Sequence, residues 1–346
     1  MSEQLTSDML KDQLDRVLRT YVDMPLLRTA ERGIRPVALE NALAGLGFGT
    51  ALVAEDQGGA GLTWSDIAGV FETLGYHAAP VPLGETMLAH WALAQLHHRL
   101  PEGVVPAISL DTLPFDSNGK VNGTAQVPWG RQATHVLAEL HGNGETRLAL
   151  IDATAAKISA IQTVGRDPSA RLVLESAPVL ASAPVGPIGL IPALAVLRAA
   201  QISGALSRTL ELCIDYGNTR VQFGRPIGKF QAVQHLIAGL AGEAACAKAG
   251  VQLALAGFDS GNGWESAAIA KIRASGAVAK STFAAHEAHG AIGVTEEHIL
   301  HYFTRRLWQW RDEGGNEHYW SERLGERLLA DRSTSLWTHI VDWSKG

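Results

Sequence analysis

The first hundred residues place apolar side chains at helical spacing. Ile67, Val70, Phe71 and Leu74 fall on one face when the chain is wound at 3.6 residues per turn. A glycine-rich stretch, ALVAEDQGGAGLTWSD, interrupts this pattern and is expected to form a loop between two helices. The pattern therefore predicts an N-terminal helical domain over residues 1–100.

Short, partly alternating apolar runs replace the helical spacing in the middle of the chain. The runs ATHVLAEL, TRLALID and ARLVLES are separated by HGNGE and GRDPS, which carry the glycine, asparagine, aspartate and proline typical of turns. This alternation predicts a middle β domain of five to seven short strands over residues 101–185.

Helical spacing then returns and continues towards the C-terminus. Leu206, Leu210 and Cys213 share one helical face, and similar stripes follow further along the chain. Many alanine and glycine residues lie among them, which permits close helix–helix approach. This predicts a C-terminal four-helix bundle over residues 186–346. The expected fold class is mainly α with a small β domain.

Charge and composition narrow the functional classes. The formal net charge of −6 argues against a nucleic-acid surface or a polybasic membrane patch. The longest apolar stretch, about residues 185–200, contains proline and glycine and is too short for a membrane span. Cys213 and Cys246 lie in helical patterns, which do not suggest a disulfide framework, and no targeting signal is recognised. We therefore expect a cytoplasmic protein that binds neither nucleic acid nor membrane.

The segment TRVQFGRPIGKFQAVQH, residues 219–235, gathers polar and aromatic groups around a turn. Gly224 and Pro226 predict the turn itself. Arg220 offers fork-shaped donors for a pyrophosphate, and Phe223 offers a flat face for a heteroaromatic ring. This set suits a dinucleotide. The alternative is a helix hairpin with ordinary polar side chains.

Three segments resemble motifs of the acyl-CoA dehydrogenase family. RVQFGRPIGKFQAVQ is similar to the family's Arg-x-x-Phe-Gly-x-x-Ile-x-x-(Phe)-Gln segment, and HGAIGVTEEH is similar to its Gly-Gly-x-Gly-(Tyr/Phe)-Thr-x-Glu segment. VAEDQGGAGLTWSD resembles the family's Pro-Glu-x-x-Gly-Gly-x-Gly loop, with Ala54 where proline is common. The three segments lie in the family's order over nearly the whole chain. The resemblance implies the family's helix–β–helix layout and FAD as the cofactor.

The resemblance also implies which residues contact FAD. In the family, the segment matching residues 219–231 reaches across a dimer interface to the FAD of a neighbouring subunit, where Arg220 would pair with the pyrophosphate. Gly290 and Ala291 of the HGAIG turn would lie against the same FAD, and Glu287 stands where the family usually has glutamine. The residues matched to the adenosine half of FAD are Gln222, Phe223, Ile227, Phe230 and Gln231.

The β domain departs from the family pattern. The family's Thr-Glu-Pro-x-x-Gly-Ser stretch, which binds the flavin ring and the substrate, is not found, and AISLDTLPFDSNGKVNG runs in its place. The family's Trp-(Ile/Phe)-(Thr/Ser) signature beside the flavin ring is replaced by VPWGRQA. Trp129 is therefore a candidate to cover the flavin ring, and the alternative is an ordinary aromatic residue at the end of a strand.

The family's reaction needs a carboxylate base to remove a proton alpha to a thioester carbonyl. Family members carry that glutamate in one of two places. The first matches Leu194 and Ala195, where this chain has no carboxylate. The second matches the turn DEGGNEHYW and makes Glu313 the candidate base, with neighbouring tryptophans that could raise its pKa by desolvation. The alternative is a solvated carboxylate on a surface or interface turn.

Two further groups of polar residues carry weaker expectations. Arg305 and Arg306 are expected at the end of a helix, where they would either complement the helix dipole or meet CoA phosphates. The histidines in this region share no usual metal-ligand spacing, so we expect no metal site. They are His286, His289, His298 and His301.

Taken together, the resemblance implies an FAD-dependent acyl-CoA dehydrogenase, or a subunit of one. Such an enzyme introduces an alpha–beta double bond into an acyl-CoA by proton abstraction and hydride transfer to flavin. The incomplete β-domain motif is similar to the small subunit of bacterial heterotetramers that shorten steroid side chains. The alternatives are a noncatalytic scaffold completing the FAD site of a catalytic partner, and a flavin monooxygenase on the same fold. Expected partners are an acyl-CoA, electron-transfer flavoprotein as acceptor, and either copies of this chain or a second dehydrogenase-like chain.

Overall fold

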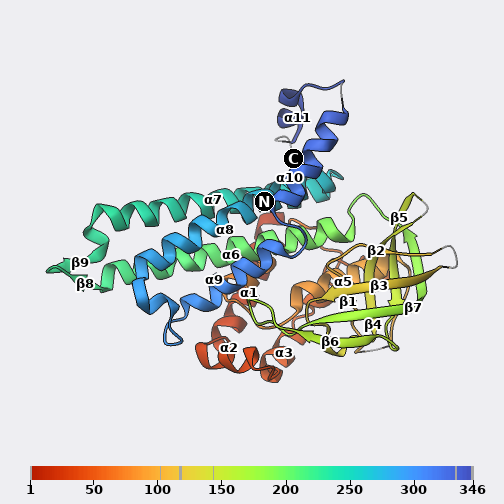
Figure 1. Cartoon of the computed structure of the whole chain (residues 1–346), viewed down its shortest axis with the longest axis horizontal. Coiled ribbons are helices and arrows are strands. Elements are labelled where there is room, and N and C mark those ends of the chain that lie inside the picture. Colours follow the sequence, from red (N-terminus) through yellow and green to blue (C-terminus); the bar gives the residue numbers. More distant parts are fainter. Residues whose placement is uncertain (1, 102, 117–118, 143, 332, 344–346) are drawn as a thin grey trace.

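A computed structural model describes residues 2–101, 103–116, 119–142, 144–331 and 333–343. Figure 1 shows a long helical bundle at one end of a curved sheet, with the first helices packed beneath both. The order along the chain is helical, then β, then helical, which confirms the predicted fold class.

The N-terminal part is built from one helix of 20 residues and several shorter ones. The segment ALVAEDQGGAGLTWSD lies between two of them, and its only helical element is a single 3-10 turn at Glu55–Gln57, so the predicted loop is confirmed. The elements before residue 100 are α1 (Ser2–Tyr21), α2 (Met24–Glu31), α3 (Val37–Ala44), η1 (Phe48–Thr50), η2 (Glu55–Gln57), α4 (Ala68–Tyr76) and α5 (Leu83–Gln95).

The middle part is a mixed sheet with strand order β1-β4-β5-β7-β3, in which β2 also pairs with β4 and β6 with β7. The three apolar runs singled out in the sequence form β4, β5 and the first half of β7. The strand β7 is the longest, because it pairs with β3 and β6 along its first half and with β5 along its second. The strands are β1 (Ala107–Ile108), β2 (Leu113–Pro114), β3 (Lys120–Val127), β4 (His135–Gly142), β5 (Glu145–Asp152), β6 (Lys157–Ile161) and β7 (Ser169–Pro184).

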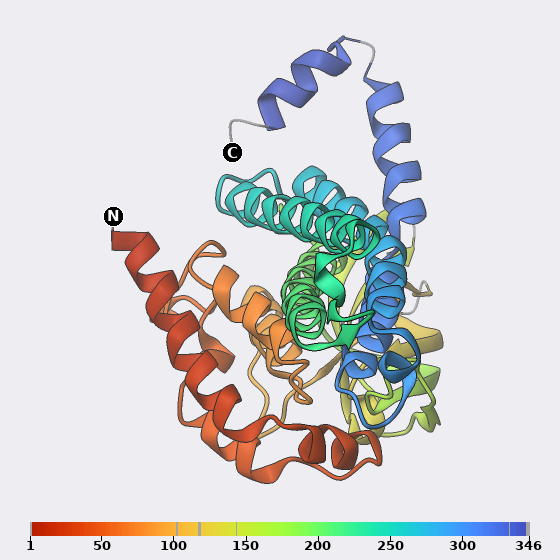
Figure 2. The ribbon, with the colours of Figure 1, turned by 90° about the vertical axis from the view of Figure 1, so that its left-hand side faces the viewer.

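Four helices form the bundle, as predicted. They are α6 (Leu190–Thr219), α7 (Gln231–Asp259), α8 (Gly263–His289) and α9 (Leu300–Asp312). A small hairpin joins α6 to α7, and the 3-10 turn η5 (Gly290–Val294) follows α8. Two more helices, α10 (Glu317–Ala330) and α11 (Leu336–Trp343), extend away from the bundle in Figure 2.

The helix α6 is the centre of the molecule. By length and composition it could cross a membrane, but 94% of its most apolar window is buried inside the protein, as expected for a core helix. It packs closely against α4, because a Cβ added at Gly204 would lie 1.9 Å from the carbonyl oxygen of Glu72. One continuous core of apolar residues joins the N-terminal helices, one face of the sheet and the bundle. The three regions are therefore packed on a shared interior.

Candidate cofactor and active site

The segment singled out for cofactor binding folds as a hairpin at the end of the bundle. Its strands β8 (Val221–Gln222) and β9 (Arg225–Pro226) are joined by Phe223 and Gly224, and both turn residues have positive φ angles of 52° and 77°. Two positive φ angles define the tight turn that suits a two-residue hairpin. An aromatic residue rarely adopts this backbone conformation, and strain of this kind is found mainly at functional positions.

The hairpin presents its side chains to solvent. Phe223 is 92% exposed, and its ring lies 6.1 Å from the ring of Phe230. The guanidinium of Arg225 lies 4.2 Å from the centre of the Phe230 ring. Arg220, at the end of α6, also has an exposed side chain, as does Gln231. This group of exposed aromatic and cationic side chains is held on a defined backbone and not on a loose loop.

The HGAIG turn lies at the same end of the bundle as the hairpin. Tyr216, one turn of helix before Arg220, stacks on His289 with ring centres 4.7 Å apart. His289 directly precedes Gly290, which ends α8 with a φ of 63°. Glu287, Gly290 and Ala291 are exposed. The structure thus brings together the two segments that the sequence analysis assigned to one FAD.

Trp129 lies in a different part of the molecule. It sits two residues beyond β3, has a φ of 58° and is half-buried. It lines a cavity of about 320 Å³ that also involves Gly33, Arg35 and Pro168. This cavity lies between the N-terminal helices and the sheet, and Glu313 does not line it.

Glu313 follows the last residue of α9 and begins a tight turn. Gly314 and Gly315 both have positive φ angles, 71° and 85°. A Cβ added at Gly314 would lie 3.1 Å from the backbone nitrogen of Ala195. The turn therefore packs directly on Leu194 and Ala195, and the two alternative base positions named from the sequence are neighbours in space.

The carboxylate of Glu313 is buried, so the alternative of a solvated surface carboxylate was wrong. Its side chain is 7% exposed and its Oε2 lies 2.6 Å from Nε of Arg198. Its Oε1 accepts a hydrogen bond of 2.8 Å from Nε2 of Gln309. Nη2 of Arg198 lies 2.7 Å from Oε1 of Glu85, so one guanidinium serves two carboxylates. Burial raises the pKa of Glu313, and the Arg198 guanidinium opposes that shift.

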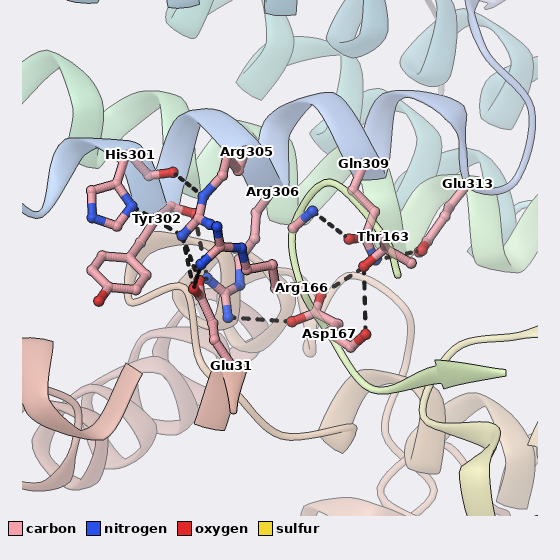
Figure 3. A network of polar contacts seen from close by, with 11 residues as sticks. Glu31, Thr163, Arg166, Asp167, His301, Tyr302, Arg305, Arg306, Gln309 and Glu313 are labelled. Carbon is pink, nitrogen blue, oxygen red and sulfur yellow. Dashed lines mark hydrogen bonds and ion pairs between the residues drawn. The ribbon is translucent and has the colours of Figure 1, made fainter. Parts of the chain in front are cut away.

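A second group of charges continues from Glu313 along α9, as Figure 3 shows. Asp167, on the loop before β7, lies 3.2 Å from Nη2 of Arg306 and accepts a hydrogen bond from Gln309. Arg305 donates to both oxygens of Glu31 at 2.7 and 2.9 Å. Arg305 and Arg306 therefore lie within α9 and not at its end, and the predicted helix-end position was wrong. They join the bundle to α2 and the sheet.

A cavity of about 410 Å³ opens beside the Glu313 turn. It lies between the sheet and the bundle, and Glu313 itself lines it together with Gly314 and Gly315. Asp111 and Thr112 line it from the sheet, and Tyr319 and Arg323 line it from α10. The segment that replaces the family's Thr-Glu-Pro motif thus still faces the candidate reaction site.

The tryptophans near the turn have separate roles. Trp320 is buried and donates a 2.8 Å hydrogen bond from its indole nitrogen to the carbonyl oxygen of Gly314. Trp310 is also buried, whereas Trp308 is partly exposed. Burial desolvates Glu313, and the hydrogen bond from Trp320 fixes the backbone of the turn.

The described residues hold no cluster of histidine, cysteine, aspartate or glutamate side chains that could bind a metal ion. Both cysteines are free, Cys213 buried and Cys246 exposed.

Comparison with known proteins decides the family. Residues 193–329 match the model of the acyl-CoA dehydrogenase C-terminal domain. The acyl-CoA dehydrogenase IpdE2 of Mycolicibacterium smegmatis is 31% identical over 311 residues, which cover 88% of this chain and 93% of that protein. The chain belongs to the acyl-CoA dehydrogenase family.

Solved structures of acyl-CoA dehydrogenases share the whole fold of this family member. The Tcur3481-Tcur3483 steroid ACAD is 25% identical with a TM-score of 0.86, covering 96% of this chain and 100% of that one. The ChsE4-ChsE5 complex from Mycobacterium tuberculosis has a TM-score of 0.85 at 22% identity, covering 95% of this chain and 98% of that one. The second likeness bears on the fold alone.

Within this member of the acyl-CoA dehydrogenase family, the sequence analysis missed the residues that hold Glu313. Arg198 stands alone among apolar residues in ALAVLRAAQ, and Lys271 does so in AAIAKI. Charged side chains are almost never fully buried unless they are paired, so a lone charge inside an apolar helical face is a usable signal for a buried partner. Their partners could not be named, because they lie far away along the chain.

Lys271 provides a pH-dependent prediction. Its ammonium is fully buried and donates to the carbonyl oxygens of Trp310 and Arg311, which end α9, and to Oγ of Ser275. Burial, helped by the positive charge of Arg198, lowers the pKa of Lys271 to about 7. The unfolded value is about 10.4, so between these values the unfolded chain binds a proton that the folded chain lacks.

The stability contribution of Lys271 should therefore increase as pH rises from 7 towards 10. Urea unfolding of the wild type and of Lys271→Met at several pH values would measure this. The difference in the free energy of unfolding should change in favour of the wild type by up to about 1.4 kcal/mol per pH unit. A difference that stays constant with pH would show that the folded lysine remains charged throughout this range.

Proposed function

We propose that this chain is a subunit of an FAD-dependent acyl-CoA dehydrogenase whose FAD site is completed by a second chain of the same fold. The exposed hairpin carries the proposal. Phe223 is 92% exposed at the tip of the hairpin, where the tight turn gives its backbone a positive φ of 52°. A binding partner that covers the hairpin would explain why the conformation is retained.

The residues at this end of the bundle fit the adenosine and pyrophosphate parts of FAD. Arg220 would hold the pyrophosphate, and Phe223 and Phe230 would hold the adenine with apolar faces. Gly290, with its positive φ and no atom within 4 Å of an added Cβ, leaves room for close approach of the cofactor to the backbone. Gln222, Ile227, Gln231, Glu287 and Ala291 complete the proposed set. Bound FAD would supply the hydride acceptor for the reaction.

The substrate in this proposal is an acyl-CoA, and one similar solved structure supports a class of acyl group. The Tcur3481-Tcur3483 steroid ACAD, at 25% identity, supports a steroid-derived acyl group. The same solved structure names two chains, which supports a heteromer over a homo-oligomer. Trp129 is retained as a candidate flavin contact, and electron-transfer flavoprotein as the acceptor. The dehydrogenase relatives favour dehydrogenation over the monooxygenase alternative.

The test is to express the chain alone and, separately, together with a dehydrogenase-like chain encoded beside it. The visible flavin spectrum would be recorded against protein concentration, before and after addition of acyl-CoA. We expect little flavin with the chain alone, and flavin that acyl-CoA bleaches when both chains are present. One bleachable flavin per chain for the chain alone would refute the shared site, and no flavin in either sample would refute the assignment of FAD.

A further inference from the structure

We propose that Arg198 is a positioning residue for proton abstraction, which holds the Glu313 carboxylate at the wall of the cavity of about 410 Å³, and that Glu85 moderates its effect by sharing the same guanidinium. The inference rests on the proposed function, because it takes Glu313 as the base that the family resemblance implies. Removal of the alpha proton would turn the carboxylate into a neutral acid, while the alpha C–H electron pair forms the double bond and the beta hydrogen leaves as hydride. Arg198 acts through Glu313, since Glu313 lines the cavity and Arg198 does not.

The two oxygens of the Glu313 carboxylate have different surroundings. Oε1 accepts the 2.8 Å hydrogen bond from Nε2 of Gln309. The orientation of that amide is fixed, because its own Oε1 accepts a 2.9 Å hydrogen bond from the backbone nitrogen of Gly165, and its Nε2 also donates to Asp167 (Figure 3). Oε2 of Glu313 is buried, and within the described residues it accepts no hydrogen bond. Oε2 is therefore the oxygen that keeps a lone pair for a proton.

Arg198 supplies this carboxylate with a charge more than with a hydrogen bond. Its Nε lies 2.6 Å from Oε2 of Glu313, but the two atoms lack the alignment that a hydrogen bond needs. Its other nitrogens hold the guanidinium in place, since Nη2 lies 2.7 Å from Oε1 of Glu85 and Nη1 donates to Oε1 of Gln201 at 2.6 Å. A fixed positive charge beside Oε2 favours the ionised carboxylate and leaves its lone pair available.

Burial and charge act on Glu313 in opposite directions. Burial has the largest effect and raises the pKa of Glu313, while the Arg198 guanidinium and the hydrogen bond from Gln309 lower this pKa. The carboxylates of Asp167 and Glu85 raise it again. A base needs this balance, because it must be ionised before it reacts and must then bind the proton firmly. The charged and titratable groups near Glu313 or around its cavity are Arg198 of α6, Glu85 of α5, Asp167, Lys271 of α8, Asp312 of the same turn, and Asp111, Tyr319 and Arg323.

Glu85 offers the sharpest test, because its neutral variant keeps the shape of the side chain. Glu85→Gln removes one of the two carboxylates on Arg198, while the amide oxygen can still accept from Nη2. The guanidinium then serves Glu313 alone, so the pKa of Glu313 should fall by roughly half a unit to one unit. Arg198→Met should raise the pKa of Glu313 by about one unit or more, and Arg198→Lys should partly restore it, because lysine returns a positive charge.

The first measurement needs no flavin. The infrared band of the protonated Glu313 carboxyl group is followed against pH in the purified chain, after subtraction of the same protein carrying Glu313→Gln. The matched control is Glu72→Gln, which neutralises a carboxylate that accepts a 3.1 Å hydrogen bond from Ser203 of α6 and does not pair with Arg198. This control should leave the titration of Glu313 unchanged. An unchanged midpoint for Glu85→Gln, or one at higher pH, would overturn the proposal even where Arg198→Met fails to fold.

The second measurement uses the assembled, flavin-loaded complex. The rate at which acyl-CoA reduces the flavin should rise with pH as Glu313 loses its proton, and this rise should move to lower pH in Glu85→Gln and to higher pH in Arg198→Met. A purely structural role would change the maximal rate or the stability and leave the midpoint in place. Lys271, whose pKa is about 7, titrates nearby, so Lys271→Met serves as a check and should retain the rise.

The outcomes separate this inference from the function on which it rests. A rise that disappears in Lys271→Met would assign it to the lysine and overturn the proposal. Infrared shifts without matching shifts in the rate profile would show that Glu313 is not the base. If the wild-type pair of chains binds no flavin, the proposed function fails and the catalytic role fails with it, whereas the infrared comparison still decides whether Arg198 and Glu85 control the ionisation of Glu313.

Discussion

Replacement of Arg198 by methionine is expected to lower the free energy of unfolding by about 3–5 kcal/mol, because it leaves Glu85 and Glu313 buried without their counter-charge. Methionine retains much of the volume of the side chain, so the effect reports the loss of charge more than the opening of a cavity. The measurement is the midpoint and slope of urea unfolding, compared with the wild type at the same pH.

The triple variant Glu85→Gln, Arg198→Met and Glu313→Gln, which removes all three charges together, is the control for this loss. Replacing a complete buried ion cluster by uncharged residues is often neutral, whereas removing one member is costly. The triple variant should therefore recover most of the stability that Arg198→Met loses. Equal instability of the two variants would mean that packing, and not charge pairing, explains the role of Arg198.

The assembled complex that carries Arg220→Ala should be purified with much less bound FAD than the wild-type complex. A hydrogen bond to a charged group contributes about 1.5–3 kcal/mol, which corresponds to a ten- to hundredfold weaker affinity for the cofactor. The flavin content of the purified complex, and its retention during dialysis, would measure this. Arg220 is exposed at the end of α6, so the variant should fold and assemble normally.

Lys229→Ala is the matched control, since it removes another exposed cation from the same segment. The resemblance to the family assigns this lysine no contact with FAD. Equal flavin content in the Arg220 variant and the wild type would show that the pyrophosphate lies elsewhere. Equal losses in both variants would point to a general effect of positive charge.

The sequence predicted the architecture well because the signals involved are local. The helical spacing at Ile67–Leu74 and the turn chemistry between the strands depend on neighbours a few residues apart. The turn within residues 219–235 could be predicted for the same reason, because Gly224 and Pro226 lie in it, whereas the FAD contacts of this segment stay a prediction from the resemblance. The pairing of the long strand β7 with three other strands could not be predicted from the sequence.

The surroundings of Glu313 could not be predicted, because they are assembled from distant parts of the chain. The turn, with its tryptophans and glycines, is compatible with either a base or a surface carboxylate. Only the fold shows that Arg198 from α6 meets Glu313 and that Glu85 from α5 shares the same guanidinium. The pattern of residues along one segment does not show which distant residues will contact it in the fold.

The charge pairs that join both ends of the chain have a consequence for its synthesis. Glu31 and Glu85 leave the ribosome early, but their partners Arg305, Arg306 and Arg198 follow much later. A nascent chain that has completed only its first helices and its sheet would lack Arg198 beside Glu85, and Glu31 would have Arg166 as a partner but neither Arg305 nor Arg306. The N-terminal region therefore cannot reach its final packing before α9 has been translated, and the whole polypeptide is expected to acquire protease resistance in one late step and not region by region.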